Sequence, residues 1–281
     1  MAKDTKKKKA EKKARTALKT AKKAHQKTKK QRRASISSTE SEDIDTILAS
    51  FQTTTTTTPT PREVKCPPPR ARSATTLLPS PTSKELILFG GEFFSGERAS
   101  FSNELFIYKV ASRQWRRVEG DGPLPRSGHA VALLPSKGEY YLFGGEFSSS
   151  RQKAFYHYGD LWRLTARGGW AWERIGNSTA KGGAGPSARS GHRMVAYKQF
   201  VFLFGGFQDT ANETKYLDDT WVFDTSTEKW WSVATQGLKP AARSSFSFLP
   251  HPEGAVLVGG YSRVKETLRG GRTTTRPLVH V

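Results

Sequence analysis

The sequence predicts an all-β protein made of repeated antiparallel sheets, and three observations support that fold class. Gly-Gly pairs begin at residues 90, 144, 205 and 259, so successive pairs lie 54, 61 and 54 residues apart. A short apolar run precedes each pair, and each of the first three pairs is followed by an acidic residue two places before a large aromatic. Short β-prone segments bounded by Gly, Pro, Asn or Asp are typical of strands in a meander. Recurrence at a near-constant spacing indicates an array of similar units.

The third unit shows the complete pattern, from residue 186 to residue 233. It opens on a Pro, reaches Arg-Ser-Gly-His at residues 189–192, and its apolar run at residues 201–204 ends at a Gly pair. Glycine is expected there because the end of this buried strand needs backbone angles that residues with side chains avoid. A third strand is expected around Trp221 and a fourth at Trp230. On this template the other units occupy residues 70–118, 125–175 and, in part, 240–262.

The fourth unit departs from the template after its glycines. Residues 244–249 and 255–258 supply two β-prone segments, but neither an acidic–aromatic step nor a closing Trp follows. The sequence therefore predicts three complete four-stranded sheets and part of a fourth, with exposed strand edges. Residues 263–281 are interpreted as an atypical C-terminal tail. One hypothesis that follows is that the chain is a truncated, non-functional fragment of a larger protein.

The repeated features of residues 67–262 resemble the kelch family, whose repeats fold as the blades of a β-propeller. Three further motifs and a Lys-rich N-terminus are similar to the kelch-domain-containing protein four subfamily. The motifs are Cys-Pro-Pro-Pro at residues 66–69, Gly-Gly-Glu-Phe at residues 90–93 and Phe-Tyr-His-Tyr at residues 155–158. The resemblance implies a protein–protein interaction scaffold. It also implies an incomplete propeller, because such rings close with roughly four to eight blades.

Positive charge is concentrated at the N-terminus. The formal net charge is +21, and residues 1–33 hold 16 Lys or Arg against Asp4 and Glu11, a net +14. This tail is predicted to be disordered, or helical against an anionic surface, because it has little apolar surface to bury. Three interpretations stay open: a solubilising tail, a nuclear or nucleolar targeting signal, and an arm that contacts RNA or ribosomes. Because the tail has no aromatic residue, RNA contact would be independent of base sequence and sensitive to salt.

Residues 34–66 are predicted to be a Ser/Thr/Pro-rich linker with a short amphipathic segment at residues 41–52. The segment is either a helix docked on the sheets or a free partner-binding motif. Its apolar residues recur at helical spacing, at Ile44, Ile47, Leu48 and Phe51. Ser35 follows a pair of arginines and is a possible phosphorylation site, where a phosphate would partly neutralise the basic tail.

Cysteine usage and hydropathy indicate where the protein functions. Cys66 is the only cysteine, so no disulfide can form within the chain and a reducing compartment is expected. The N-terminus lacks the apolar core of a signal peptide, and no run is long enough to cross a membrane. The predicted localisation is cytoplasm, nucleus or both, with no membrane partner.

The parity of a four-stranded meander places the Arg-Ser-Gly-His segments and the loops after the Gly pairs on one rim. Arginine among exposed aromatics is typical of binding hot spots, so this rim is the predicted site for a protein partner. The candidate contact residues are Phe93, Phe94, Arg98, Arg126, Phe147, Phe155, Tyr156, Tyr158, Arg189, Arg193, Phe207, Arg243, Tyr261 and Arg263. Because Arg126, Arg189 and Arg243 repeat in register, they are alternatively bonds between blades. His129 and His192 are interpreted as packing residues for the same reason.

Catalytic and cofactor sites find little support in the sequence. A metal centre would need a cluster of His, Cys and carboxylates, whereas the six histidines are scattered or fixed by the repeat register. No Gly-x-Ser-x-Gly nucleophile elbow is present. We therefore expect a protein that is not an enzyme, with no catalytic residues, no bound metal and no cofactor.

Overall fold

The computed structural model describes residues 44–53, 60–96, 98–152, 154–176, 185–209, 213–267 and 273–280. The chain divides into two compact units, residues 1–46 and 47–281, and the sheets belong to the second. The helix α2 (Ile44–Thr53) covers most of the segment with helical spacing. Within the described ranges, no helix is long and apolar enough to span a bilayer. The basic tail and Ser35 lie outside the described residues, so the expectations for them stay predictions.

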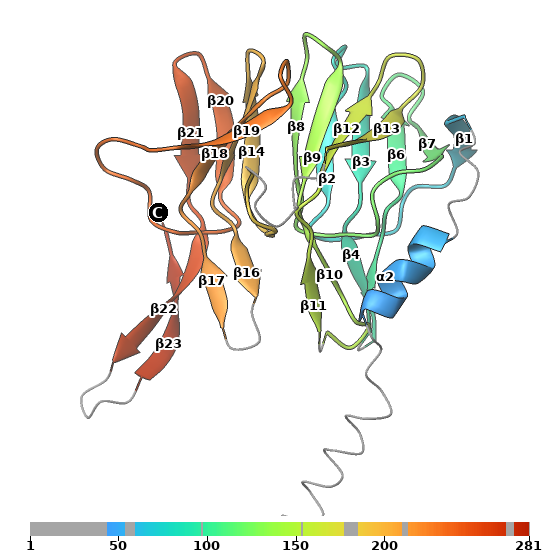
Figure 1. Cartoon of the computed structure of the whole chain (residues 1–281). Helices are drawn as coiled ribbons and strands as arrows, with labels where there is room; N and C mark the ends of the chain where they lie inside the picture. Colours follow the sequence, from blue (N-terminus) through green and yellow to red (C-terminus); the bar gives the residue numbers. More distant parts are fainter. Residues whose placement is uncertain are drawn as a thin grey trace, which may run out of the picture. The chain divides into compact units, whose positions relative to one another are not determined.

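Four antiparallel sheets follow one another along the chain, and we call them blades 1 to 4 (Figure 1). Blade 1 has the strand order β1 (Arg62–Cys66), β7 (Gln114–Glu119), β6 (Leu105–Lys109), β3 (Glu85–Phe89) and β2 (Thr76–Pro79). Blade 2 has the order β13 (Ala171–Ile175), β12 (Leu161–Thr165), β9 (Glu139–Phe143) and β8 (Ala130–Leu134). Blade 3 has the order β19 (Lys229–Val233), β18 (Thr220–Asp224), β15 (Phe200–Phe204) and β14 (Arg193–Tyr197). Blade 4 pairs β21 (Gly254–Val258) with β20 (Ser247–His251). The predicted all-β, propeller-type fold is confirmed.

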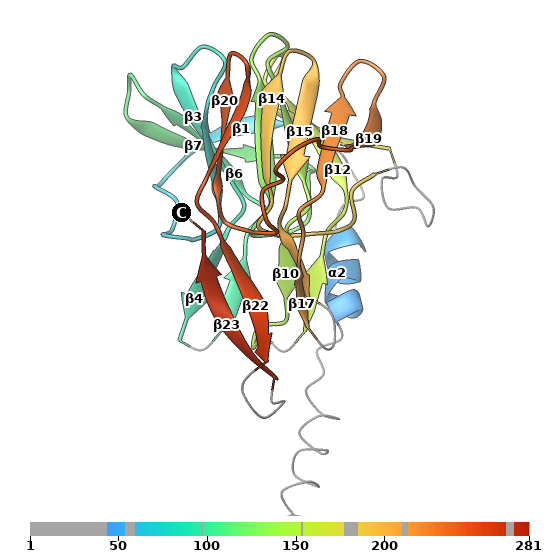
Figure 2. The same ribbon diagram turned by 90° about the vertical axis from the view of Figure 1, so that its left-hand side faces the viewer.

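A two-stranded hairpin extends from each blade directly after its Gly pair. The hairpins are β4 (Glu92–Ser95) with β5 (Arg98–Phe101), β10 (Glu146–Ser148) with β11 (Phe155–His157), β16 (Phe207–Asp209) with β17 (Thr214–Tyr216), and β22 (Tyr261–Thr267) with β23 (Thr273–Val279). In Figures 1 and 2 they project from the same end of the blades. Isolated bridges join the repeated serine of each unit to the first hairpin residue, as in Ser127 to Glu146. The prediction that these segments share one rim is therefore confirmed, and we call this end the loop rim.

Successive blades pack face to face through apolar side chains. The core between blades 1 and 2 contains Ile87, Phe89, Leu105, Ile107, Tyr140, Leu142, Leu164 and Trp170. The core between blades 2 and 3 contains Ala130, Ala132, Leu134, Tyr141, Phe143, Leu161, Ile175, Met194, Val201, Leu203, Phe223 and Trp230. Alternate residues of β9 enter the two cores, because side chains along a strand point to opposite faces. Both faces of blade 2 are buried, which explains why β9 is apolar or aromatic at nearly every position.

The Gly pairs are the points where one blade contacts the opening segment of the next. Gly144 has φ +66, and a Cβ built on it would lie 2.6 Å from the Arg189 carbonyl oxygen and 2.8 Å from Cε1 of His192. A Cβ built on Gly90 would likewise lie 2.8 Å from the Arg126 carbonyl oxygen and 2.7 Å from Cε1 of His129. No side chain fits in such a gap, so the glycines are required by packing between blades as well as by backbone conformation.

The inner edge strands β2, β8, β14 and β20 lie next to one another in chain order. Backbone hydrogen bonds connect the turns that precede them. The amide of Gly128 donates to the Ala74 carbonyl at 3.0 Å, and the amide of Gly191 donates to the Gly128 carbonyl at 2.8 Å. The amide of Ser245 donates to the Gly191 carbonyl at 2.9 Å. This chain of bonds fixes the blades around a common axis.

Besides the rim hairpins, which form where the sequence predicted loops, strands also form in the predicted linker and in the predicted C-terminal tail. Residues 62–66, interpreted as linker, form β1 on the outer edge of blade 1, antiparallel to β7. Residues 273–279, interpreted as an atypical tail, form β23, which pairs with β22 over seven residues. Thr-rich and Val-containing stretches of this kind have high β-propensity, and an open backbone edge lies within reach of each. The C-terminal residues therefore complete a rim hairpin, while blade 4 keeps only two strands.

Candidate partner-binding rim

The repeated arginines of blades 2 and 3 are structural. Arg126 is completely buried and binds Asp160 through two hydrogen bonds of 2.7 and 2.9 Å, with a further bond to the Gly144 carbonyl at 3.0 Å. Arg189 repeats this geometry with Asp219, at 2.6 and 2.9 Å. Burial alone would raise the pKa of Asp160, but the Arg126 guanidinium holds it below its usual value. Bidentate pairs of this kind fix a side chain strongly.

These pairs correct two of our expectations. Arg126 and Arg189 are 0% exposed, so neither side chain can contact a partner. Their side chains also do not bridge blades, because Asp160 and Asp219 belong to the same blade as the arginine that binds them. The contact to the preceding blade comes instead from the backbone, where the amide of Gly91 donates to the Arg126 carbonyl at 2.8 Å.

Two aromatic candidates are also buried and were wrongly predicted as contact residues. Tyr158 is 4% exposed, donates its hydroxyl to the Pro125 carbonyl at 3.0 Å and lies under Arg126. Phe147 is 7% exposed and packs against Phe101, with ring centroids 5.1 Å apart, and against Phe51 of α2 at 6.1 Å. The sequence contains no signal for which face of a two-stranded hairpin turns toward its neighbour.

The remaining candidates are accessible to different degrees on the loop rim. Phe94, Phe155 and Tyr156 are 51%, 43% and 39% exposed, and Arg98 and Arg263 are exposed as well. Five candidates are half-buried: Phe93, Arg193, Phe207, Arg243 and Tyr261. We call the three exposed aromatics, which lie on the hairpins of blades 1 and 2, the aromatic patch.

A cavity of about 350 Å³ opens where the first residues of the inner strands converge. All four units contribute to its lining, with Thr76, His129, Ala130, Arg193, Met194 and Ser245 among the residues. Arg193 donates from Nη1 to the His192 carbonyl at 3.0 Å, and no carboxylate in the described part of the chain pairs with it. Burial lowers the pKa of Arg193 from its ordinary value, as expected for a guanidinium without a counter-charge. We call this space the axial cavity.

The two histidines next to this cavity are neutral packing residues, as the repeat register suggested. Burial, followed by the charges of Arg126 and Arg193, lowers the pKa of His129 to about 3. Burial also holds the pKa of His192 well below its usual value. His129 packs edge-on against Phe89 and His192 against Phe143, at centroid distances of 5.3 and 5.6 Å. The positive charge facing the axial cavity therefore comes from Arg193.

Ser190, His157 and Asp209 meet at the junction of the blade 2 and blade 3 hairpins. Nδ1 of His157 lies 2.8 Å from the Ser190 hydroxyl, and the Asp209 carboxylate lies 3.5 Å from Nε2. The backbone amide of Asp209 donates to Nε2 at 3.0 Å, so Nε2 is the acceptor and Nδ1 carries the proton. The imidazole therefore donates to Ser190 and cannot act as its base, which is the opposite of a hydrolase triad. Both ring nitrogens are engaged, so neither has a lone pair free for a metal.

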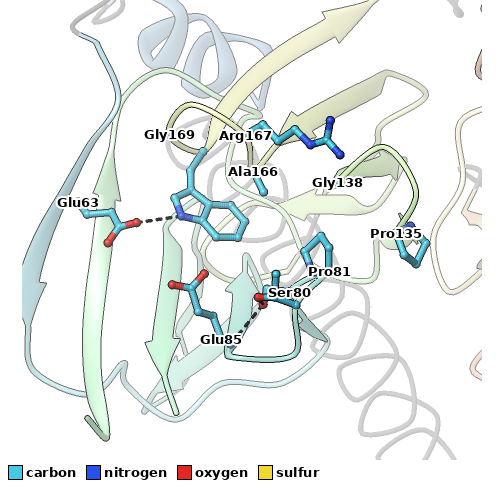
Figure 3. Close-up of a pocket in the computed structure, with 11 residues that line it drawn as sticks. Glu63, Ser80, Pro81, Glu85, Pro135, Gly138, Ala166, Arg167 and Gly169 are labelled. Carbon is cyan, nitrogen blue, oxygen red and sulfur yellow. Dashed lines mark hydrogen bonds between the residues drawn. The ribbon is translucent and has the colours of Figure 1, made fainter. Parts of the chain in front are cut away.

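A second cavity of about 460 Å³ lies at the opposite end, between blades 1 and 2 (Figure 3). Trp170 forms one wall, and its indole N–H donates to the Glu63 carboxylate at 2.9 Å. Glu63 and Glu85 both pair with Lys109, and Glu63 also pairs with Arg116, so their charges are already balanced. Trp170 has φ +48, an unusual conformation for a large residue, and the preceding Gly-Gly was the signal in the sequence that could have indicated this turn.

Comparison with known proteins agrees with this architecture. A family model described as the KLHDC2/KLHL20/DRC7 Kelch-repeats domain matches residues 35–262. Human host cell factor 2 is 29% identical over 207 residues, covering 68% of this chain and 24% of the relative. Human host cell factor 1 is 26% identical over 194 residues, covering 64% of this chain and 9% of the relative. The chain therefore corresponds to only a small part of the length of these relatives.

Among solved structures, that of YjhT aligns with a TM-score of 0.53 at 15% identity, covering 68% of this chain and 59% of that chain. A likeness at this identity concerns the fold alone. The family match spans all four units, and with the blades and Gly pairs described above it establishes that the chain belongs to the KLHDC2/KLHL20/DRC7 Kelch-repeats domain family.

Proposed function

We propose that this protein is a non-catalytic protein-interaction scaffold that binds its partner on the loop rim. The observation that carries the proposal is the half-buried guanidinium of Arg193 in the axial cavity, which pairs with no carboxylate of the described residues. Removing a charge from water without a counter-charge is costly, so a ligand that supplies a carboxylate gains an interaction that the free protein lacks. The cavity of about 350 Å³ is large enough to admit such a group.

The aromatic patch lies on the same rim, on the hairpins of blades 1 and 2. Aromatic residues and arginine are enriched in binding hot spots, and Phe94 and Phe155 are each more than 40% exposed. The partner that fits both features is a protein segment with an acidic group and neighbouring apolar side chains. Charge complementarity would fix its orientation, and aromatic burial would supply most of its affinity.

Affinity capture with the full chain, comparing wild type with Arg193→Met, tests the proposal. Arg167→Met is the matched control, because Arg167 is an exposed arginine lining the cavity at the opposite end. Partners of the rim should be lost with Arg193→Met and kept with Arg167→Met, and the measured Kd should rise at least tenfold. Arg193→Met should not lower the thermal midpoint, because none of the described residues forms an ion pair with Arg193. Partners that both variants retain equally would refute the role of the rim.

The hydrogen-bond polarity at His157 supports the non-catalytic part of the proposal. Ser190, His157 and Asp209 bring together the residue types of a nucleophile, base and acid arrangement. Because His157 accepts a backbone N–H and donates toward Ser190, it cannot remove the hydroxyl proton. Ser190 is also completely buried, so a substrate could not reach it.

The basic tail supports a second candidate function, that of an RNA- or ribosome-associated factor. The supporting observation is the net charge of +14 in residues 1–33. RNA binding should then fall steeply with salt and disappear when residues 1–33 are deleted, whereas absence of binding at low salt would exclude this function. We also propose that the protein is located in the cytoplasm, the nucleus or both. We further propose that it belongs to the kelch-domain-containing protein four subfamily, on the basis of the basic tail and of the motifs at residues 66–69, 90–93 and 155–158.

A further inference from the structure

The junction between the hairpins of blades 2 and 3 contains an excess of carboxylates. One carboxylate oxygen of Glu146, one carboxylate oxygen of Asp209 and one ring nitrogen of His157 lie within 4.8 Å of one another. Glu92, from the hairpin of blade 1, accepts a hydrogen bond of 3.2 Å from Ser127 and raises the pKa of Glu146 through its charge. Three blades thus each contribute one carboxylate to this place.

One oxygen of this cluster has no hydrogen-bond donor. Oε2 of Glu146 is buried, and no described residue donates to it. Nδ1 of His157 is 3.9 Å away, beyond hydrogen-bond distance, and its proton is directed to Ser190. His157 is also neutral here, because Nε2 accepts the Asp209 amide and burial lowers the pKa of the imidazole. An ionised Glu146 would therefore face Glu92 and Asp209 with no compensating positive charge from the described residues.

We propose that the junction is a proton-dependent latch, in which the protonated carboxyl of Glu146 lets the hairpins β10–β11 and β16–β17 stay in contact. His157 forms this contact by bonding Ser190 and the Asp209 amide across the two blades. When Glu146 is ionised, its carboxylate is repelled by those of Asp209 and Glu92. This repulsion pushes apart the hairpins β10–β11 and β16–β17, which His157 joins. The latch lies beside Phe147, so its opening also loosens the base of the aromatic patch, a consequence that rests on the proposed function.

The pH window follows from the direction of the shift. Burial, then the charges of Glu92 and Asp209, raise the pKa of Glu146 from 4.5 to about 7 in the closed form, while the Ser190 hydroxyl opposes this rise. A carboxyl with a raised pKa stabilises the closed form fully below pH 4.5. That contribution falls as pH rises and is lost once pH passes about 7. The latch therefore tightens on acidification from neutral pH.

Thermal unfolding of the full chain between pH 4.5 and 8.5, comparing wild type with Glu146→Gln, tests the latch. The amide of Gln keeps the shape of a protonated carboxyl and cannot ionise. The unfolding equilibrium constant of wild type relative to Glu146→Gln should rise by up to about tenfold per pH unit between pH 5 and 7 and level off above 7. Parallel pH profiles for the two proteins would overturn the proposal.

Three controls keep the test decisive. Asp209→Asn removes one like charge, so its pH-dependent loss of stability should occur at lower pH than that of wild type. This comparison does not require Glu146→Gln to fold. Hydrogen exchange should show the pH effect in the peptide covering residues 146–158 and not in the blade 4 hairpin, which begins with Tyr261. If Ca²⁺ or Zn²⁺ at pH 8 stabilises wild type but not Glu146→Gln, and EDTA reverses this, the junction binds a cation in place of a proton and the latch is refuted.

Discussion

Blades 2 and 4 carry the same repeated residues in very different surroundings. In blade 2, a Cβ at Gly144 would collide with the opening segment of blade 3 at 2.6 Å, whereas at Gly259 of blade 4 the nearest atom is the His280 carbonyl oxygen, 3.7 Å away. Arg126 binds Asp160 bidentately, whereas the equivalent Arg243 donates to the Gly259 carbonyl and has no carboxylate partner among the described residues. The glycine contacts therefore depend on the next blade, whereas the arginine pair depends on the third strand of its own blade, which blade 4 lacks.

The apolar residues of the two blades show the same contrast. Tyr141 and Phe143 of blade 2 are buried against blade 3, but Leu249, Val256 and Val258 of blade 4 are 54%, 44% and 55% exposed. Burial of apolar surface provides about 25 cal/mol per Å², so blade 4 contributes less to stability than the complete blades. Substitutions at equivalent positions of blades 2 and 4 should therefore have unequal effects.

The largest difference is expected for Gly144→Ala against Gly259→Ala. Both glycines have positive φ, +66 and +72, so each alanine introduces backbone strain of about 1 kcal/mol. At Gly144 the new methyl group also collides with the backbone of the next blade, and the free energy of unfolding should fall by about 4 kcal/mol in total. Urea denaturation monitored by tryptophan fluorescence measures both values. Equal losses at the two sites would show that backbone strain alone explains the glycines.

A smaller difference is expected for the arginine pairs. Asp160→Asn leaves Arg126 completely buried without its counter-charge, which should lower the free energy of unfolding by about 3 kcal/mol. Arg243→Gln removes hydrogen bonds to the Ala241 and Gly259 carbonyls from a partly exposed side chain and should cost about 1 kcal/mol. Denaturation at pH 7 compares the two variants. If Asp160→Asn costs no more than Arg243→Gln, the pair in blade 2 contributes no net stability.

The pH dependence of Asp160 sharpens this comparison. The neighbouring guanidinium lowers the pKa of Asp160 in the folded state, even though burial acts in the other direction. Its contribution to stability is therefore present above the ordinary pKa of 3.8 and is lost as pH falls below that value. Wild type should approach the stability of Asp160→Asn between pH 4 and 2. A constant gap across this range would contradict the ionic origin of the effect.

How much of this could be predicted from the sequence depends on whether a feature lies inside one repeat or joins several. The strands before the Gly pairs and the shared loop rim follow from spacing and parity, so they were predicted. The sequence could not predict that Phe147 is buried while Phe155 is exposed. Both residues lie on one short hairpin, and only contact with the neighbouring hairpin determines which of its faces is buried. The axial cavity and the carboxylate cluster combine residues from three or four repeats, and no local pattern encodes their convergence.

The smallest predicted effect concerns His192, whose place in blade 4 is taken by Phe246. Both rings pack edge-on against an aromatic of the preceding blade, at centroid distances of 5.6 Å in each case. His192 is completely buried, and neither of its nitrogens has a partner in the described part of the structure. His192→Phe keeps the ring contact and removes two unsatisfied polar atoms, so it should stabilise the fold by about 1 kcal/mol at pH 7.

The advantage of His192→Phe should also grow with acidity. Burial, with Arg189 and Arg193 nearby, holds the pKa of His192 well below 6.5 in the folded state. The unfolded chain takes up a proton below about pH 6.5 while the folded chain does not, so wild type loses stability there and the Phe variant does not. Denaturation of both proteins at pH 7.5, 6 and 5 measures the gap. A difference in stability that stays constant across these pH values would mean that protonated His192 is stabilised in the folded state. The histidine of blade 3 and the phenylalanine of blade 4 would then not be equivalent in packing.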